Sequence, residues 1–237
     1  MKEGKPMPNH TIFNERPESQ DRALKVIEKL GYTIVPRSEA EKKRGSRRAV
    51  LFTEELQSFL SHQMYQFGTE ERYFSGGSIA KAMQTVDQFS VAGLYAENKA
   101  IYELLCAGKS MEEDLPDGTR QSFDLSFIDF EHPENNTFQV TDEFEVERPN
   151  GKFARPDIVV NGIPLVVIEC KKSSVDVMEG VNQNIRNWGE EYIPHLFRYT
   201  QLVLAMNPDK VLYGTCGTPA KYFVSWHEDD KEWLNNW

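Results

Sequence analysis

The sequence predicts an α/β fold in which a mixed central β-sheet is flanked by helices. Up to Ser110 the apolar residues recur mostly at helical spacing, and beyond Ser110 they alternate with polar residues as in half-buried strands. Two short apolar runs, residues 158–160 and 165–168, then precede one more amphipathic helix and further strands. This order of helices, four strands, a helix and more strands favours a sheet covered by helices.

The first half of the chain supplies most of the expected helices. Residues 1–16 resemble a loose arm, and a helix is expected over residues 17–30, with Gly31 as its stop. Its apolar face would consist of Ala23, Val26, Ile27 and Leu30. A short extended piece ends before Pro36. Further helices are expected over residues 53–67, 78–86 and 93–108.

Strands dominate the second half. Residues 120–130 alternate, with Phe123, Leu125, Phe127 and Asp129 on one face. After a turn at Asn135-Asn136, a second alternating strand is expected within residues 136–151. The two apolar runs follow as strands, then a helix over residues 177–188. The last strands are expected within residues 199–207, 210–215 and 221–226.

Composition indicates a soluble, cytoplasmic protein of one domain. Hydrophobic residues make up 39% of the chain and charged residues 27%, as in ordinary globular domains. No apolar run approaches the roughly 20 residues of a transmembrane helix, so no membrane contact is expected. The cysteines number three and are far apart, which favours reduced thiols over a disulfide framework or a zinc site. Residues 1–50 would form an arm and first helix, packed on a core of residues 51–237.

The formal net charge of −10 is unfavourable for a nucleic-acid binder, because phosphate contacts dominate affinity. A DNA partner would therefore touch this chain locally, or be held mainly by other subunits. The one dense basic run, residues 41–48, is most simply interpreted as a solvated loop. A segment that contacts phosphate or docks on a subunit is the alternative.

Three charged residues stand at the ends of the two apolar runs. Asp157 precedes the first run, and Glu169 and Lys171 follow the second. Glu169 and Lys171 are two apart on a strand and therefore project from the same face. Two carboxylates and a lysine at a sheet rim suit a hard divalent cation and phosphodiester hydrolysis, with the ammonium stabilising developing charge. A structural ion-pair cluster is the alternative.

The hairpin loop around Asn161 decides whether Asp157 reaches that face. A regular two-residue loop would turn Asp157 to the face opposite Glu169. A three-residue loop of residues 160–162 would put Asp157 opposite Leu165, on the face of Glu169. The metal site therefore requires an odd-length loop or a bulge.

Specific stretches of the chain resemble a known family. Pro156-Asp157 and Glu169-Cys170-Lys171 match the PD-(D/E)xK nuclease signature. Longer matching stretches are IDFEHPENNTFQVTDEF, RPDIVVNGIPLVVIECKKS, IPHLFRYTQLVLAMN and YGTCGTPAKYF. From about Val35 to Trp226 the chain resembles the N-terminal nuclease domain of the restriction (R) subunit of type I restriction-modification enzymes. The resemblance implies a restriction-endonuclease-like core.

The resemblance also implies roles for individual residues. Asp157 and Glu169 would hold one or two Mg²⁺ ions, and Lys171 would be the catalytic lysine. Glu97 matches an acidic helix position that often completes such sites. The implied activity is cleavage of double-stranded DNA without sequence specificity of its own. The implied partners are methyltransferase and specificity subunits.

Two departures from the family pattern leave alternatives open. The family often carries Gln-x-x-x-Tyr on the helix after the lysine, whereas Gln183 is followed by Asn187. Gln183 lies opposite the apolar stripe of its helix, so a residue that positions DNA and a plain surface amide are both open. No G-x-x-x-x-G-K-[ST] motif is present, so ATP is expected only in the full-length subunit and not on this chain. A catalytically silent docking module of the R subunit is the alternative function.

Overall fold

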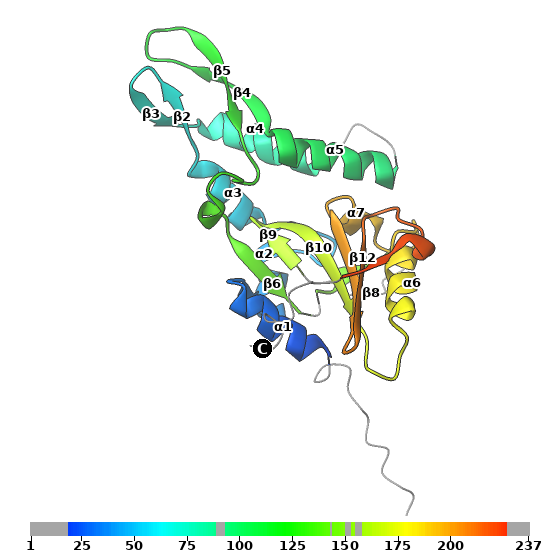
Figure 1. The fold of residues 1–237 in the computed structure, drawn as a ribbon. Helices are drawn as coiled ribbons and strands as arrows, with labels where there is room; N and C mark the ends of the chain where they lie inside the picture. The colour runs from blue at the N-terminus through cyan, green and yellow to red at the C-terminus, as the bar shows by residue number, and fades with distance from the viewer. Residues whose placement is uncertain (1–18, 89–92, 143, 150–152, 155–157, 227–237) are drawn as a thin grey trace, which may run out of the picture.

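A seven-stranded mixed β-sheet organises the computed structural model, which describes residues 19–88, 93–142, 144–149, 153–154 and 158–226 (Figure 1). In spatial order its strands are β1 (Thr33–Val35), β6 (Phe138–Thr141), β9 (Ile158–Val160), β10 (Ile163–Cys170), β11 (Leu202–Asn207), β12 (Lys210–Gly214) and β13 (Val224–Ser225). The β1–β6 and β10–β11 pairs are parallel, and the other pairs are antiparallel. The prediction of a mixed α/β fold is confirmed.

Helices cover the two faces of this sheet unequally. On one face lies α6 (Val177–Asn187), which connects β10 to β11. The main core includes Val167, Val177, Val181 and Val203. On the other face lies α1 (Asp21–Lys29), whose Leu24 and Ile27 pack on a smaller cluster built around Val140 and Ile168. The carboxyl end of β10 therefore contacts the core mainly on the face of the sheet that α6 covers.

The beginning of the chain is joined to the sheet through β1. Thr33 pairs with Gln139 and Val35 with Thr141, which makes β1 an edge strand beside β6. The division at residue 50 expected from the sequence stays a prediction.

A helix–hairpin unit, residues 53–125, extends away from the central sheet (Figure 1). Its elements are α3 (Thr53–Ser61), β2 (Met64–Phe67), β3 (Glu70–Tyr73), α4 (Gly76–Asp87), α5 (Leu94–Ala107), β4 (Lys109–Asp114) and β5 (Arg120–Leu125). β2 pairs with β3, and β4 with β5. The ring of Tyr65 stacks on Phe123 at 4.1 Å between centroids, which joins the two hairpins.

Smaller elements complete the described part of the chain. They are the strand pair β7 (Val146–Glu147) and β8 (Phe153–Ala154), α2 (Arg37–Arg44), α7 (Pro194–Phe197) and the 3₁₀ turns Pro133–Asn135 and Ala220–Tyr222.

The helix expected over residues 53–67 is wrong in its second half. It ends at Ser61, and residues 64–67 form β2 instead. Gly68, with φ of 62°, makes the tight turn into β3. Gln63 also accepts a hydrogen bond from Ser126 N at 2.8 Å. Pairing with β3 and contact with a distant segment therefore override the local helical spacing.

The strand expected over residues 120–130 is also only partly present. β5 ends at Leu125, and its partner β4 was not expected from the sequence. β6 belongs to the central sheet, so the turn near Asn135 does not join two paired strands. Asp129 lies in the connection rather than on a strand face, and it accepts a hydrogen bond from Asn135 Nδ2 at 2.8 Å.

The basic run of residues 41–48 is a solvated loop only in its second half, where residues 45–48 are exposed. Its first half belongs to α2, and Arg44 is only 4% exposed and stacks over the ring of Phe144 at 4.2 Å. Burial lowers the pKa of Arg44 to about 10. Glu145 lies 3.8 Å from Arg47, and Glu147 lies 3.4 Å from Arg48. Much of the positive charge is therefore used to attach α2 to residues 144–147.

Candidate active site at the carboxyl end of β10

The β9–β10 hairpin turns through two residues and then shifts register. Asn161 has φ of 48° and Gly162 has φ of 80°, as a two-residue primed turn requires. Val160 pairs with Ile163, but Ile158 pairs with Val166, so β10 contains one extra residue. Of the two arrangements that would allow a shared metal face, the structure has the bulge and not the three-residue loop.

The turn is fixed by its contact with α3. Phe52 N donates to the Gly162 carbonyl at 2.8 Å, and a Cβ on Gly162 would lie only 2.3 Å from the Phe52 oxygen. Asn161 is fully buried, and its side chain accepts from Thr137 N at 2.7 Å. The hairpin therefore enters β10 in a single fixed geometry.

Along β10, the alternation of side chains brings Glu169 to the α6 face. Val167 is 1% exposed in the main core, and Glu169 follows it two residues later. Cys170 packs on the opposite face, in the cluster with Ile168. Lys171 N donates to the Met206 carbonyl at 2.7 Å, which holds the chain beside β11 for one residue beyond the strand.

Lys171 joins Glu169 and Gln183, and we call these three residues the Lys171 cluster. Lys171 Nζ lies 2.8 Å from Glu169 Oε1 and 2.9 Å from Gln183 Oε1. The side chains of Lys171 and Glu169 are each 12% exposed. An ammonium has three N–H donors and no acceptor, so these two oxygens fix the direction in which it points.

Gln183 reaches this cluster because the buried face of α6 extends beyond its apolar stripe. The buried residues of α6 are Val177, Gly180, Val181, Asn184 and Asn187. Asn184 Nδ2 donates to the Leu204 carbonyl at 3.0 Å, which turns the small and amide side chains toward the sheet. Gln183 thereby lies at the rim of the buried face, in contact with Lys171, rather than as a plain surface amide.

Gly180 is a site residue that the sequence reasoning missed. A Cβ at this position would lie 3.1 Å from Ala205 Cβ and 3.4 Å from Glu169 Cγ. The absence of a side chain therefore lets α6 approach the strand that carries Glu169. A glycine inside an otherwise good helix was the signal, since glycine there is unfavourable unless close contact requires it.

Two further predicted site residues, Asp157 and Glu97, are not among the described contacts of the Lys171 cluster. Asp157 lies outside the described residues. Glu97 is in the first turn of α5, with Oε2 3.8 Å from Arg198 Nε. The adjacent Asn98 donates to the Thr200 carbonyl at 2.8 Å. Thr200 precedes β11, which runs parallel to β10, so this end is roughly 20 Å from Lys171 at strand spacing. The structure does not bring Glu97 to the Lys171 cluster.

Asn187, at the position where the family often has tyrosine, is 4% exposed. Its carbonyl accepts from Ile193 N at 3.2 Å, so it supports the connection from α6 to α7. The described residues contain no group of three or more His, Cys, Asp or Glu side chains that could hold a metal ion. Glu169 is the carboxylate that the described residues bring to the Lys171 cluster.

Comparison with known families identifies the family of this chain. Residues 12–222 match the family model described as the type I restriction enzyme R protein N terminus. The chain belongs to this family. The β9–β10 hairpin segment and the α6 segment both lie inside the range that matches the R protein N-terminus family.

Individual relatives of this family member carry endonuclease-subunit names. The chain is 26% identical over 93% of its length to the type I restriction enzyme HindI endonuclease subunit of Haemophilus influenzae. It is 31% identical over 64% of its length to the putative type I restriction enzyme MjaIXP endonuclease subunit of Methanocaldococcus jannaschii. The chain spans 21% and 15% of the length of these two relatives. In the described part, no helix is both long and apolar enough to span a membrane.

Proposed function

We propose that this chain is the Mg²⁺-dependent endonuclease domain of a type I restriction enzyme R subunit. It would hydrolyse phosphodiester bonds of double-stranded DNA without sequence specificity of its own. The observation that carries the proposal is the contact of Lys171 with both Glu169 and Gln183, at 2.8 and 2.9 Å. The lysine and one carboxylate of the family signature thus meet at the end of one strand, beside a crossover helix.

The fold supports a restriction-endonuclease-like core. The antiparallel β9–β10 hairpin is followed by α6 and then by β11, which runs parallel to β10. This order puts Glu169 on a central strand of the sheet, β10, rather than at its edge strands, β1 and β13. Ligand sites in open α/β sheets commonly lie outside the carboxyl ends of strands, where Lys171 lies.

The oxygen ligand that the described residues supply fits a divalent cation. Glu169 offers a carboxylate, the kind of oxygen ligand that Mg²⁺ prefers. We propose Asp157 as the second ligand. The last described pair, Ile158 with Val166, supports this, because one more residue in the same register would oppose Val167 and share the face of Glu169. Bound Mg²⁺ would polarise the scissile phosphodiester and make a water nucleophilic near neutral pH.

Lys171, Gln183 and Glu169 would orient the reacting groups and balance the charge that develops on them. Lys171 would carry a positive charge toward the phosphate, where it stabilises the negative charge that develops during hydrolysis. Gln183 would hold the ammonium in that direction through its Oε1. Glu169 would accept from Lys171 while it faces the metal. The buried Val167 and Val203 next to the cluster keep the sheet side free of water.

Assembly would supply the rest of DNA binding. The net charge of −10 argues that methyltransferase and specificity subunits bring DNA to this site. A catalytically silent docking module would have no need for the Lys171 cluster as a unit, and the metal titration below separates the two functions.

The test is a calorimetric titration of Mg²⁺ and Mn²⁺ into the chain with a short DNA duplex present. The wild type should bind metal, and Asp157→Ala and Glu169→Ala should each lose the heat of binding. Asp209→Ala, which removes an exposed carboxylate from the β11–β12 turn, is the matched control and should bind as the wild type does. Circular dichroism must first verify that each variant is folded. Equal binding by all four proteins would defeat the proposal and favour the docking module.

A further inference from the structure

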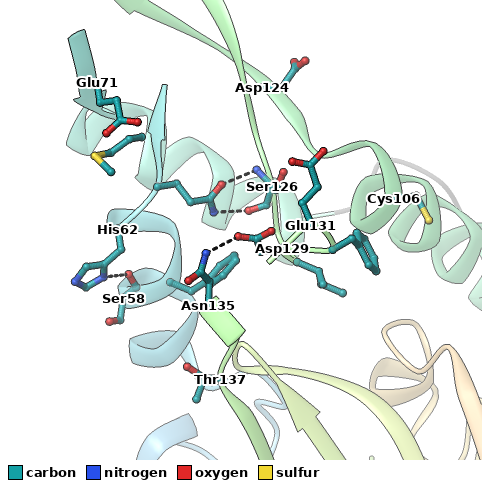
Figure 2. Close-up of a pocket in the computed structure, with 15 residues that line it drawn as sticks. Ser58, His62, Glu71, Cys106, Asp124, Ser126, Asp129, Glu131, Asn135 and Thr137 are labelled. Atoms are coloured by element: carbon teal, nitrogen blue, oxygen red, sulfur yellow. Dashed lines mark hydrogen bonds between the residues drawn. The ribbon is translucent and has the colours of Figure 1, made fainter. Parts of the chain in front are cut away.

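A cavity of about 920 Å³ opens where the helix–hairpin unit meets the central sheet (Figure 2). Residues of α3, β2 and β3 line one side, and the connection from β5 to β6 lines the other. Phe130 belongs to that connection, so we call the cavity the Phe130 groove. It takes no part in the site proposed above, which uses residues at the opposite end of β10.

Exposed apolar side chains line the groove. Phe130 is 62% exposed and Met64 is 47% exposed, and both line it. Phe59 and Ile128, which pack against the main core, also line it. Large apolar side chains gathered in a hollow, rather than scattered singly, mark a surface that contacts another molecule.

The charge around these apolar side chains is of one sign. Figure 2 shows Glu71, Asp124, Asp129 and Glu131 around the same space, and all four line the groove. The lining residues in the described part of the chain include no lysine and no arginine. Hydrogen bonds from Asn135 and from the His132 amide hold the pKa of Asp129 below its usual value, so this carboxylate keeps its charge in weakly acidic solution.

The walls of the groove are fixed by hydrogen bonds. Asn135 Nδ2 and the backbone N of His132 each donate to Asp129 at 2.8 Å. Asn136 Nδ2 donates to the Asp129 carbonyl at 2.7 Å. On the other side, Gln63 Oε1 accepts from Ser126 N at 2.8 Å. A partner would therefore bind a formed surface, with little loss of conformational entropy in the groove.

The carboxylates suit an extended cationic ligand better than a metal ion. No group of three or more potential metal ligands gathers among the described residues, so the four carboxylates line the groove without converging on one point. A DNA backbone would be repelled by them. Lysine or arginine side chains on an extended segment would match both their sign and their spread.

We propose that the Phe130 groove docks a basic segment of a partner protein. Its lysine or arginine side chains would face Asp124 and Glu131, and an apolar side chain would pack on Phe130 and Met64. The groove adjoins the Asn161 turn through Thr137, which lines it and donates to Asn161 at 2.7 Å. That turn begins β10, whereas Lys171 follows its end. A partner bound there would leave the Lys171 edge open to DNA.

The test uses a fluorescent peptide of alternating lysine and leucine, titrated with the full chain by anisotropy. Peptides of alternating glutamate and leucine, and of lysine and serine, are the comparators. The lysine–leucine peptide should bind, the glutamate peptide should not, and the lysine–serine peptide should bind more weakly. Asp124→Lys combined with Glu131→Lys should weaken binding by about tenfold. Glu28→Lys combined with Asp209→Lys makes the same change of charge on exposed carboxylates outside the groove and should have no such effect.

A second pair of variants tests the apolar contact. Phe130→Ala should weaken binding, whereas Tyr222→Ala, which removes a ring that is 61% exposed outside the groove, should not. Hydrogen exchange should show that the bound peptide protects residues 126–137. Equal loss in the groove variants and their controls, or protection confined to another surface, would overturn the proposal. Protection of residues 126–137 by a DNA duplex alone would overturn it as well.

Discussion

Two contacts fix the direction in which the Lys171 side chain points. Its flexible stem would ordinarily allow many rotamers. Here Nζ is held between Glu169 Oε1 and Gln183 Oε1, and the side chain is only 12% exposed. Glu169 lies on β10 and Gln183 lies on α6. The position of the ammonium therefore depends on how α6 packs against the sheet.

Gln183 should therefore matter for positioning rather than for metal binding. Gln183→Leu removes the acceptor and should lower the DNA cleavage rate of the reconstituted enzyme by about tenfold, as for other groups that orient a reacting side chain. Metal affinity should be unchanged, and Gln183→Glu, which keeps an acceptor oxygen, should restore much of the rate. Asn182→Leu, on the exposed neighbouring position, is the control. Equal activity of Gln183→Leu and wild type would mean that the contact is only structural.

At the scale of elements, the contact of α6 with β10 and β11 decides the geometry of the site. The apolar spacing correctly predicted a helix after the lysine, observed from Val177 to Asn187. It predicted part of the buried face, Val177, Val181 and Trp188. It missed Gly180 and Asn184, which also face the strands, while Ile185 is only partly buried. Periodicity identifies apolar stripes, and it does not identify contacts made by a missing side chain or an amide.

Gly180→Ala should be destabilising although alanine favours helices. The added Cβ would lie 3.1 Å from Ala205 Cβ, and overpacking typically costs about 1–3 kcal/mol. The gain in helix propensity offsets up to about 1 kcal/mol. We expect a net loss of about 1–2 kcal/mol in urea unfolding, with weaker metal binding because Glu169 is displaced. Gly76→Ala in α4, where nothing lies within 4 Å of the added Cβ, should cause no loss. Equal stability of the two variants would show that α6 can shift without cost.

The β9–β10 hairpin was also predicted only in part, because local spacing does not identify contacts between distant residues. The Asn-Gly pair correctly indicated a turn between the apolar strands, and the need for a register shift followed from the alternation of faces. The location of the shift, inside β10 rather than in the loop, depends on the contact of Phe52 with Gly162. That contact joins residues far apart in the chain. The spacing of apolar residues within one strand gives no information about such a contact.

At the scale of the whole molecule, the two ends of β10 face different surroundings. At its start lie the Asn161 turn and the acidic Phe130 groove, and beyond its end lies the Lys171 cluster. With a net charge of −10, the chain offers DNA little attraction of its own. The family membership and the α/β architecture could be predicted from the sequence. The helices of the protruding unit could be predicted, but its two hairpins could not, because β2 lies in a segment that local spacing described as helix and the paired strands β3 and β4 were not expected.

We propose that Lys171 serves phosphodiester hydrolysis rather than the stability of the sheet end. The most direct measurement is supercoiled-plasmid cleavage by the reconstituted restriction enzyme carrying Lys171→Ala, beside Lys172→Ala as the neighbouring control. Lys171→Ala should fold and bind metal as the wild type does, and should cleave about 100-fold more slowly or worse, as when a group that stabilises developing charge is removed. Lys172→Ala should cleave at the wild-type rate. A folded, metal-binding Lys171→Ala enzyme that cuts DNA as fast as the wild type would contradict the account.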